Sequence, residues 1–111
     1  GKVRDKTVVL VDDLTETAGT LVSAARILRR RGAKRIIAVV SHALLNDLGV
    51  KRLRKSNIDE LITTDTVPRP EIKGLKLTTL SVAGLLGEAI KRIHTNSSVT
   101  SLFEFDGVRI G

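Results

Sequence analysis

The sequence predicts an α/β fold in which about four parallel strands form one sheet, with flanking helices that make three layers. Two continuous runs of β-branched and apolar residues, Thr7 to Val11 and Arg35 to Ser41, have the composition of strands buried on both faces. Segments with helical spacing alternate with these strands, which favours right-handed crossovers and parallel pairing. A chain of 111 residues buries one core rather than two, so we expect a single domain over residues 1–111.

The remaining elements are predicted from the same periodicities and from helix-stop and turn residues. The helix after the first strand begins near Thr20 and stops at Gly32, and a second helix over Ala43 to Lys55 is interrupted by Gly49. Residues 97–111 have no strong pattern and are expected to be a tail that a neighbour orders. Between the second helix and this tail we expect, in order, a strand at Glu60–Thr64, a loop at 66–74 with both prolines, a strand at Leu75–Leu80 and a helix from Val82 to about His94.

Composition excludes several classes of function. The absence of cysteine excludes disulfides, thiolate metal sites and a cysteine nucleophile. Tyr and Trp are absent and only two Phe are present, which disfavours single-stranded nucleic-acid binding by base stacking. The apolar runs are well short of the ~20 residues of a membrane span, and the chain does not open with a secretory leader. We therefore expect a cytoplasmic protein without a membrane partner.

The net charge of +7, from 19 basic and 12 acidic residues, favours an anionic partner such as a phosphate ester, a nucleotide or a nucleic acid. The basic residues form two clusters, which we interpret first as solvated helix ends, since cations suit the negative end of the helix dipole. Contact with a partner subunit is a second interpretation, and nucleic-acid binding is disfavoured because no known binding motif accompanies the charge. The clusters are Arg29, Arg30, Arg31, Lys34 and Arg35, and Lys51, Arg52, Arg54 and Lys55.

The stretch from Val8 to Thr20, VVLVDDLTETAGT, predicts an anion-binding loop. A buried strand delivers this loop to the carboxyl edge of a parallel sheet, where ligands bind in open α/β folds. The loop becomes the first turn of a helix, whose backbone amides lack internal partners and whose dipole is positive there. The small residues Thr17, Ala18, Gly19 and Thr20 let the backbone close around a phosphate, and the two threonine hydroxyls add donors.

Asp12 and Asp13 follow the strand a few residues before this cradle. Two carboxylates beside a phosphate would repel it, so we expect them to have a role of their own. That role is to accept hydrogen bonds from sugar hydroxyls, directly or through a hydrated Mg²⁺. A ligand with vicinal hydroxyls at one end and a phosphate at the other is a pentose 5-phosphate. The alternative interpretation is a plain strand end followed by a capped helix start.

The hydrophobic strand followed by Asp-Asp and T-x-T-A-G-T resembles the phosphoribosyl pyrophosphate loop of type I phosphoribosyltransferases and of ribose-phosphate diphosphokinases (phosphoribosyl pyrophosphate synthetases). Three further stretches are similar, in order and spacing, to the C-terminal part of the diphosphokinases. They are RGAKRIIAVVSHALL, NIDELITTDTVP and LSVAGLLGEAIKRIHTNSSVTSLF, so the resemblance covers nearly everything up to Phe103. It implies a phosphoribosyltransferase-like fold and the ribose-5-phosphate-binding part of such an enzyme.

The resemblance also implies an activity and a role for each residue of the loop. Members of the family transfer a pyrophosphoryl group from ATP to ribose 5-phosphate with Mg²⁺, forming phosphoribosyl pyrophosphate. Asp12 and Asp13 would then bind the ribose hydroxyls and contact Mg²⁺ indirectly, and no residue is assigned a catalytic role. The residues around the 5-phosphate would be Glu16, Thr17, Ala18, Gly19 and Thr20.

The chain departs from the family's pattern at two positions of the loop. Glu16 stands where the family usually has Asp, which adds a methylene beside the phosphate. Ala18 stands where the family has Gly or another small residue, and it keeps the cradle small.

Residues outside the loop are further candidates. Ser98, Thr100 and Phe103 resemble the family's S-V-x-x-L-F tail, which helps form an allosteric phosphate or ADP site at a subunit interface; an ordinary polar tail is the alternative. His42 matches a common position of the family, although a structural histidine is the favoured interpretation. The residues 64–66 after the third strand belong either to the sugar site or to a plain turn.

In the family, an N-terminal half supplies most of the ATP site. We therefore expect ATP to bind only together with that half, the 111 residues alone to be inactive, and the full enzyme to be a homo-oligomer. Three alternatives stay open: a phosphoribosyltransferase, a non-catalytic regulatory relative, and a basic nucleic-acid-binding module.

Overall fold

The computed structural model describes residues 1–68, 71–105 and 108–109 of the chain. Its contacts divide the chain into two compact units, Gly1–Leu80 and Ser81–Gly111, and each unit is described by itself. The expectation of a single domain with a tail at 97–111 stays a prediction.

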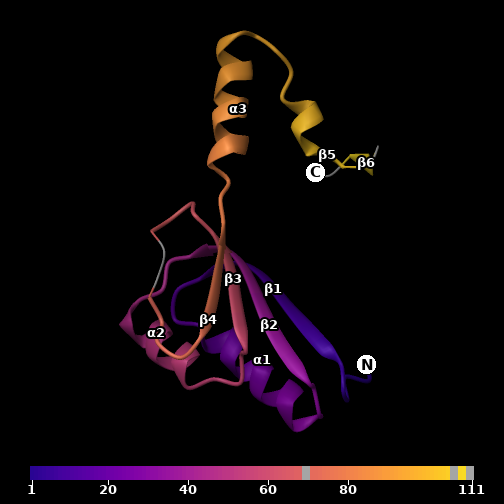
Figure 1. Cartoon of the computed structure of the whole chain (residues 1–111), viewed down its shortest axis with the longest axis vertical. Helices are drawn as coiled ribbons and strands as arrows, with labels where there is room; N and C mark the ends of the chain where they lie inside the picture. Colours follow the sequence, from indigo (N-terminus) through magenta and orange to yellow (C-terminus); the bar gives the residue numbers. More distant parts are fainter. Residues whose placement is uncertain (69–70, 106–107, 110–111) are drawn as a thin grey trace. The chain divides into compact units, whose positions relative to one another are not determined.

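The first unit is a parallel sheet with two crossover helices (Figure 1). The four strands lie in the order β1-β2-β3-β4, and all three neighbouring pairs are parallel. This arrangement, together with a third helix in the second unit, confirms the predicted α/β class and the parallel sheet of about four strands. The elements are β1 (Thr7–Thr15), α1 (Gly19–Arg30), β2 (Arg35–Ala43), α2 (Asp47–Arg54), β3 (Glu60–Thr64) and β4 (Lys76–Leu80).

The first strand and the second helix differ most from their predicted bounds. β1 continues past the apolar run to Thr15, because β2 also continues and pairs with it as far as Thr15 and Ala43. The second helix starts at Asp47 rather than Ala43, since the Asn46 side chain accepts the amide of Gly49 at 2.8 Å and caps the helix there. The helix start is therefore set by a capping side chain that the apolar periodicity does not register.

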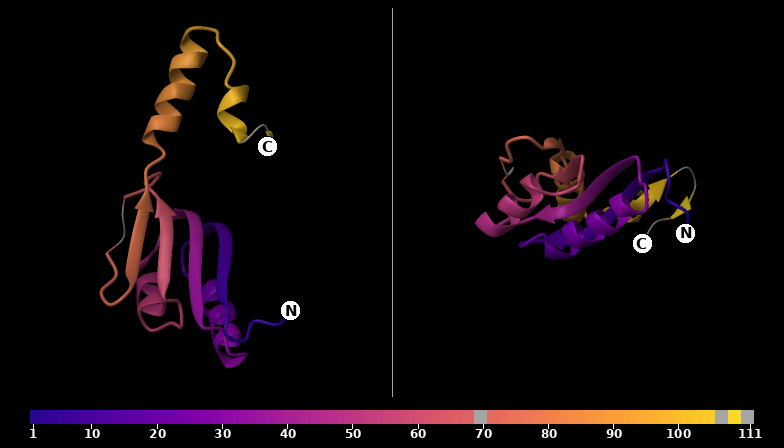
Figure 2. Two further views of the ribbon diagram at one scale, coloured as in Figure 1. Left: turned by 45° about the vertical axis from the view of Figure 1, so that its right-hand side comes forward. Right: turned by 90° about the horizontal axis from the view of Figure 1, so that it is seen from below.

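The core of this unit lies between the sheet and its two helices, which cover the same face (Figure 2). Alternate residues of β2 point into it, and they meet apolar side chains of both helices. On the opposite face, Val9 and Val11 of β1 are 51% and 77% exposed. This unit thus has one layer of helix and one of sheet, not the three layers that the sequence predicts, because both crossovers place their helices on the same face. The buried residues include Ile36, Ala38 and Val40 from β2, Leu61 from β3, Leu21 and Ala25 from α1, and Leu53 from α2.

The second unit consists of α3 (Ala83–His94), η1 (Thr100–Phe103), β5 (Glu104–Phe105) and β6 (Val108–Arg109), with β5 and β6 antiparallel. Arg92 holds the end of α3 to the following segment, because its guanidinium bonds Glu88 at 3.0 Å and the Ser98 carbonyl at 3.3 Å. Within the part of the chain that the structure describes, no helix has the length and apolar character that crossing a membrane requires.

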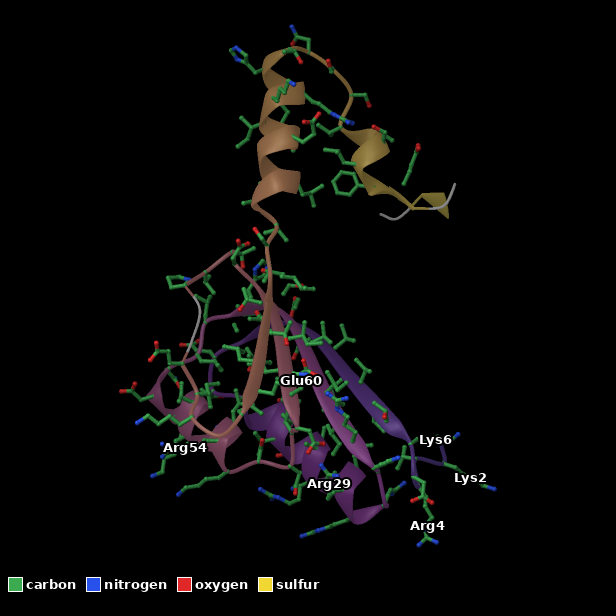
Figure 3. The ribbon with its side chains drawn as sticks, in the orientation of Figure 1. Lys2, Arg4, Lys6, Arg29, Arg54 and Glu60 are labelled. Carbon is green, nitrogen blue, oxygen red and sulfur yellow. The ribbon has the colours of Figure 1, made fainter. Side chains whose placement is uncertain are left out.

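Asp59, just before β3, ties the end of α1 to the start of β2. Its Oδ2 accepts the Arg29 guanidinium at 2.7 Å and the Ile36 amide at 2.8 Å (Arg29 is labelled in Figure 3). Burial raises the pKa of Asp59, but the hydrogen bonds from Ile36 and Arg29 and the charges of Arg29 and Arg35 outweigh it. The pKa therefore lies below its ordinary value of 3.8.

The Asp59→Asn variant should lose stability at neutral pH and less of it in acid. A lowered pKa stabilises the fold only while the carboxyl is ionised, so the contribution is complete above pH 3.8 and disappears as the pH falls through the lowered value. We expect a loss of at most about 1 kcal/mol near pH 7, since the ion pair is partly exposed. Urea unfolding at pH 7 and at about pH 3 measures it. Glu71→Gln, at an exposed position, is the control; a loss that did not shrink in acid would contradict the prediction.

Candidate functional site

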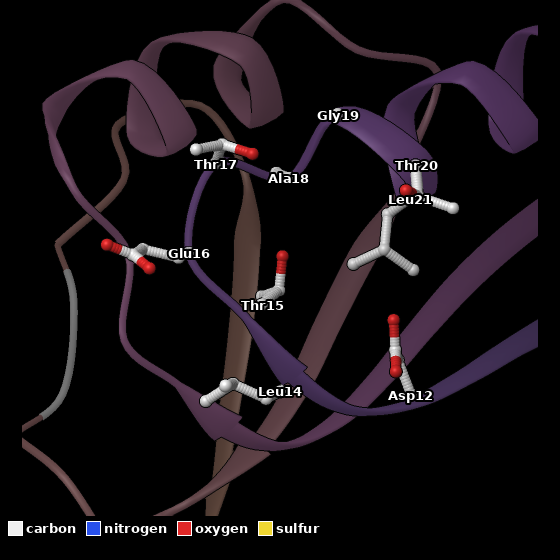
Figure 4. A pocket seen from close by; sticks show the side chains of 9 residues that line it. All are labelled: Asp12, Leu14, Thr15, Glu16, Thr17, Ala18, Gly19, Thr20 and Leu21. Atoms are coloured by element: carbon white, nitrogen blue, oxygen red, sulfur yellow. The ribbon is translucent and has the colours of Figure 1, made fainter.

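A hollow of about 270 Å³ lies where β1 passes into α1 (Figure 4). It is at the carboxyl end of the strand, as the sequence predicts for a ligand site of a parallel sheet. All five residues predicted to surround a phosphate line it, and so does Asp12, whereas Asp13 does not. The nine lining residues are Asp12, Leu14, Thr15, Glu16, Thr17, Ala18, Gly19, Thr20 and Leu21.

α1 begins at this hollow without a side-chain cap. Ala18 precedes the helix in the left-handed conformation, with φ of 58°, and only 1% of it is exposed. The first helical hydrogen bond is donated by the Val22 amide to the Ala18 carbonyl at 3.0 Å, so the amides of Gly19, Thr20 and Leu21 have no helical acceptor. α2 differs, since its first turn is capped by Asn46. The start of α1 can therefore donate several amides to an anion.

The two acidic residues of the hollow lie differently. Figure 4 shows the Asp12 carboxylate directed toward the first turn of α1 and the Glu16 carboxylate directed away from it. No Lys or Arg is among the nine lining residues. Among the nine lining residues, the only positive contribution to the potential is therefore the partial charge of the amides at the helix start.

α2 lies directly behind the loop. Its Asn46 amide donates to the Glu16 carbonyl at 3.1 Å, and a Cβ on Gly49 would lie only 2.3 Å from that carbonyl oxygen. Arg52 reaches the next peptide, since its Nη1 donates to the Thr17 carbonyl at 3.2 Å. The sequence does not predict either contact, because Arg52 is one member of a basic cluster and nothing in the local pattern relates it to a loop 35 residues away.

Asp12 and Asp13 are separated by the geometry of the strand. Because β1 continues to Thr15, successive side chains point to opposite faces, and Asp12 is half-buried at the hollow while Asp13 is exposed. In the described ranges, no three His or acidic side chains are close enough together to enclose a metal ion. Mg²⁺ needs only one or two carboxylates when it keeps its waters, so the Asp12 carboxylate at the hollow suits a hydrated ion.

The candidates at the ends of β2 and β3 bond one another. His42 Nδ1 lies 2.8 Å from Thr66 Oγ1, and the Thr64 hydroxyl donates to the Ser41 carbonyl at 2.7 Å. None of residues 64–66 lines the hollow. These contacts are those of a turn held by its own hydroxyls.

The three candidates near the end of the chain form a turn in the second unit. Ser98 Oγ accepts the Thr100 amide at 3.1 Å, and Phe103 is 50% exposed at the end of η1. Their part in an allosteric site stays a prediction.

Comparison with known proteins decides the family of the chain. Residues 1–104 match the family described as the phosphoribosyl synthetase-associated domain. The chain belongs to this family. The match includes every residue that lines the hollow, and it confirms the family expected from the loop motif.

Relatives in this phosphoribosyl synthetase-associated family carry a consistent name. The chain is 46% identical over 105 residues to ribose-phosphate pyrophosphokinase 1 of Listeria monocytogenes, and 49% identical over 105 residues to ribose-phosphate pyrophosphokinase of Synechococcus elongatus. These alignments cover 94% and 93% of the chain but 33% and 32% of the relatives. The chain therefore spans about a third of the length of the curated relatives it matches.

A solved structure agrees with the family assignment. The crystal structure of phosphoribosylpyrophosphate synthetase from Mycobacterium smegmatis superposes with a TM-score of 0.80 at 38% identity, covering 87% of this chain and 33% of that one. The fold of this chain is therefore the fold of a part of that synthetase.

Proposed function

We propose that this chain is the ribose-5-phosphate-binding part of a ribose-phosphate pyrophosphokinase and corresponds to its C-terminal portion. The observation that carries the proposal is the uncapped start of α1, which opens into a hollow with Asp12 on the opposite wall. A phosphate needs hydrogen-bond donors, and the hydroxyls of ribose need acceptors. The hollow offers donors at the helix start and an acceptor at its other end. The names of the relatives support the same ligand.

In the proposed complex, the amides of Gly19, Thr20 and Leu21 and the hydroxyls of Thr17 and Thr20 donate to the 5-phosphate. The Asp12 carboxylate accepts from a ribose hydroxyl. Bound Mg²⁺, contacted through water by Asp12 and Asp13, would neutralise negative charge on a transferred pyrophosphoryl group. This chain's own part is to hold and orient the acceptor sugar.

The donor side of the reaction is proposed to lie outside this chain. Pyrophosphoryl transfer spreads negative charge that cations must stabilise, and the described hollow has no lining Lys or Arg. We therefore expect ATP to bind only with residues that the chain does not contain, and the 111 residues alone to release no AMP from ATP and ribose 5-phosphate. Cytoplasmic location, homo-oligomeric assembly and an allosteric role of Ser98, Thr100 and Phe103 belong to the same proposal.

Titration with three ligands tests the site. Isothermal calorimetry and amide NMR shifts should show that ribose 5-phosphate binds more tightly than inorganic phosphate, and that ribose binds least, because only the first uses both ends of the hollow. The largest shifts should fall on the amides of residues 17–21. Equal affinity for ribose and ribose 5-phosphate, or shifts confined to other elements, would refute the proposed function.

Alanine variants of the two aspartates separate their roles. Asp12→Ala is expected to weaken ribose 5-phosphate about tenfold while leaving inorganic phosphate unaffected or bound more tightly, since it removes a hydroxyl acceptor and a negative charge. Asp13→Ala should weaken only the Mg²⁺-assisted part of the affinity, because this exposed side chain does not line the hollow. Titrations with and without Mg²⁺ measure both effects. An equal loss of phosphate and ribose 5-phosphate affinity in Asp12→Ala would contradict the sugar-binding role.

A further inference from the structure

Arg52 is the basic side chain in contact with the loop. Its Nη1 donates to the Thr17 carbonyl at 3.2 Å and lies 3.1 Å from the position that a Cβ on Gly19 would occupy. In the described part of the chain, Arg52 forms no ion pair with an acidic side chain. Its charge is therefore uncompensated beside the glycine that starts α1.

The hollow has two acidic lining residues, and a positive charge nearby would offset their repulsion of a phosphate. Asp12 and Glu16 are both lining residues, and a phosphate dianion must approach them without a cation among the nine. The amides at the helix start supply partial charges only. A guanidinium within contact distance of the Gly19 position offsets part of the repulsion without blocking the hollow.

The contact also acts on the shape of the loop. The Thr17 carbonyl belongs to the peptide that precedes Ala18, the residue in the left-handed conformation. Arg52 holds this peptide from a helix that already abuts the loop, through the Asn46 amide on the Glu16 carbonyl and the close approach of Gly49. The consecutive carbonyls of Glu16 and Thr17 are thus both held from α2 and its cap. The amides at the start of α1 are therefore oriented by these contacts as well as by the loop itself.

We propose that Arg52 is a positioning residue of the sugar-phosphate site: its hydrogen bond to the Thr17 carbonyl orients the amides at the start of α1, and its charge favours a phosphate there. The proposal rests on the proposed function for the identity of the ligand. It assigns one member of the basic cluster to the site and leaves its neighbour Arg54 as a solvated residue (Figure 3).

Three variants of the protein test this assignment. Arg52→Gln removes the charge, Arg52→Lys keeps the charge without the planar fork, and Arg54→Gln removes the same charge from an exposed position of the same helix. Ribose 5-phosphate is the ligand, at two salt concentrations, and its dissociation constant is one readout. The second readout, taken without ligand, is hydrogen exchange of the Asn46 and Val22 amides, which donate to the Glu16 and Ala18 carbonyls on either side of the Thr17 peptide.

We expect Arg52→Gln to weaken ribose 5-phosphate about tenfold, as loss of a charge-assisted hydrogen bond would, and Arg54→Gln to stay within about twofold of wild type. Arg52→Lys should recover part of the affinity but not the slow exchange of the two amides. Salt should weaken the affinity of the wild type more than that of Arg52→Gln, because salt screens the Arg52 charge, which the variant lacks.

The outcomes separate this inference from the function on which it rests. If the wild type binds and Arg52→Gln and Arg54→Gln bind equally well, the role of Arg52 is refuted while the site stands. If the wild type binds no sugar phosphate, the proposed function fails, and hydrogen exchange then decides alone: unchanged amides in Arg52→Gln overturn the positioning role. Should Arg52→Gln fail to fold, Arg52→Lys against Arg54→Gln gives the same comparison.

Discussion

The Gly19→Val variant is expected to lose at least about 100-fold in affinity for ribose 5-phosphate, about 3 kcal/mol, while keeping its fold. A Cβ at this position already lies 3.1 Å from Arg52 Nη1, and the valine methyl groups would extend over the first amides of α1. The fold should survive, because the tight neighbour is the end of a flexible side chain and Gly19 lies outside the left-handed region. The loss comes from crowding of the loop, not from a change in the sheet.

Gly84→Val is the matched control, since Gly84 lies near the start of α3 and has open space where a Cβ would be. Calorimetric titration gives the affinities, and thermal unfolding checks that both variants fold. Equal affinity of Gly19→Val and wild type would show that the loop does not hold the phosphate. A general loss of folding in Gly19→Val, but not in Gly84→Val, would contradict the statement that only the loop is crowded.

The second large effect is expected at Ala18, where glycine and valine should act in opposite directions. Ala18 has φ of 58° and is 1% exposed, so it combines a conformation that favours glycine with a tightly packed side chain. Ala18→Gly should stabilise the protein by up to about 1 kcal/mol and keep ligand binding, because relief of the left-handed conformation, about 1–2 kcal/mol, exceeds the loss of one buried methyl group, about 0.8 kcal/mol. Ala18→Val should destabilise it by about 2–4 kcal/mol, because a β-branched residue is strained there and overpacks the core.

Denaturant unfolding of the three proteins measures these differences. Ribose 5-phosphate titration of Ala18→Gly checks that the loop remains competent. A loss of stability in Ala18→Gly as large as the loss in Ala18→Val would contradict the left-handed conformation of residue 18.

Much of the candidate site is contiguous in sequence, which is why the sequence predicts it. A strand, a short loop of small residues and a helix start follow one another between Val8 and Thr20, and local steric and hydrogen-bonding rules suffice to make them an anion cradle. The extent of β1 is different. It depends on pairing with β2 as far as Ala43, and that pairing brings only one aspartate, Asp12, to the hollow.

The sequence by itself determined the α/β class, the parallel sheet, the family and the loop, because each follows from periodicity or from a run of adjacent residues. Tertiary structure alone decided that α2 backs the loop, with Gly49 against one carbonyl and Arg52 on the next. It also decided that α1 and α2 share one face of the sheet. These are contacts between segments tens of residues apart, and they depend on how each crossover packs against the sheet, which the spacing of apolar residues within a segment does not encode.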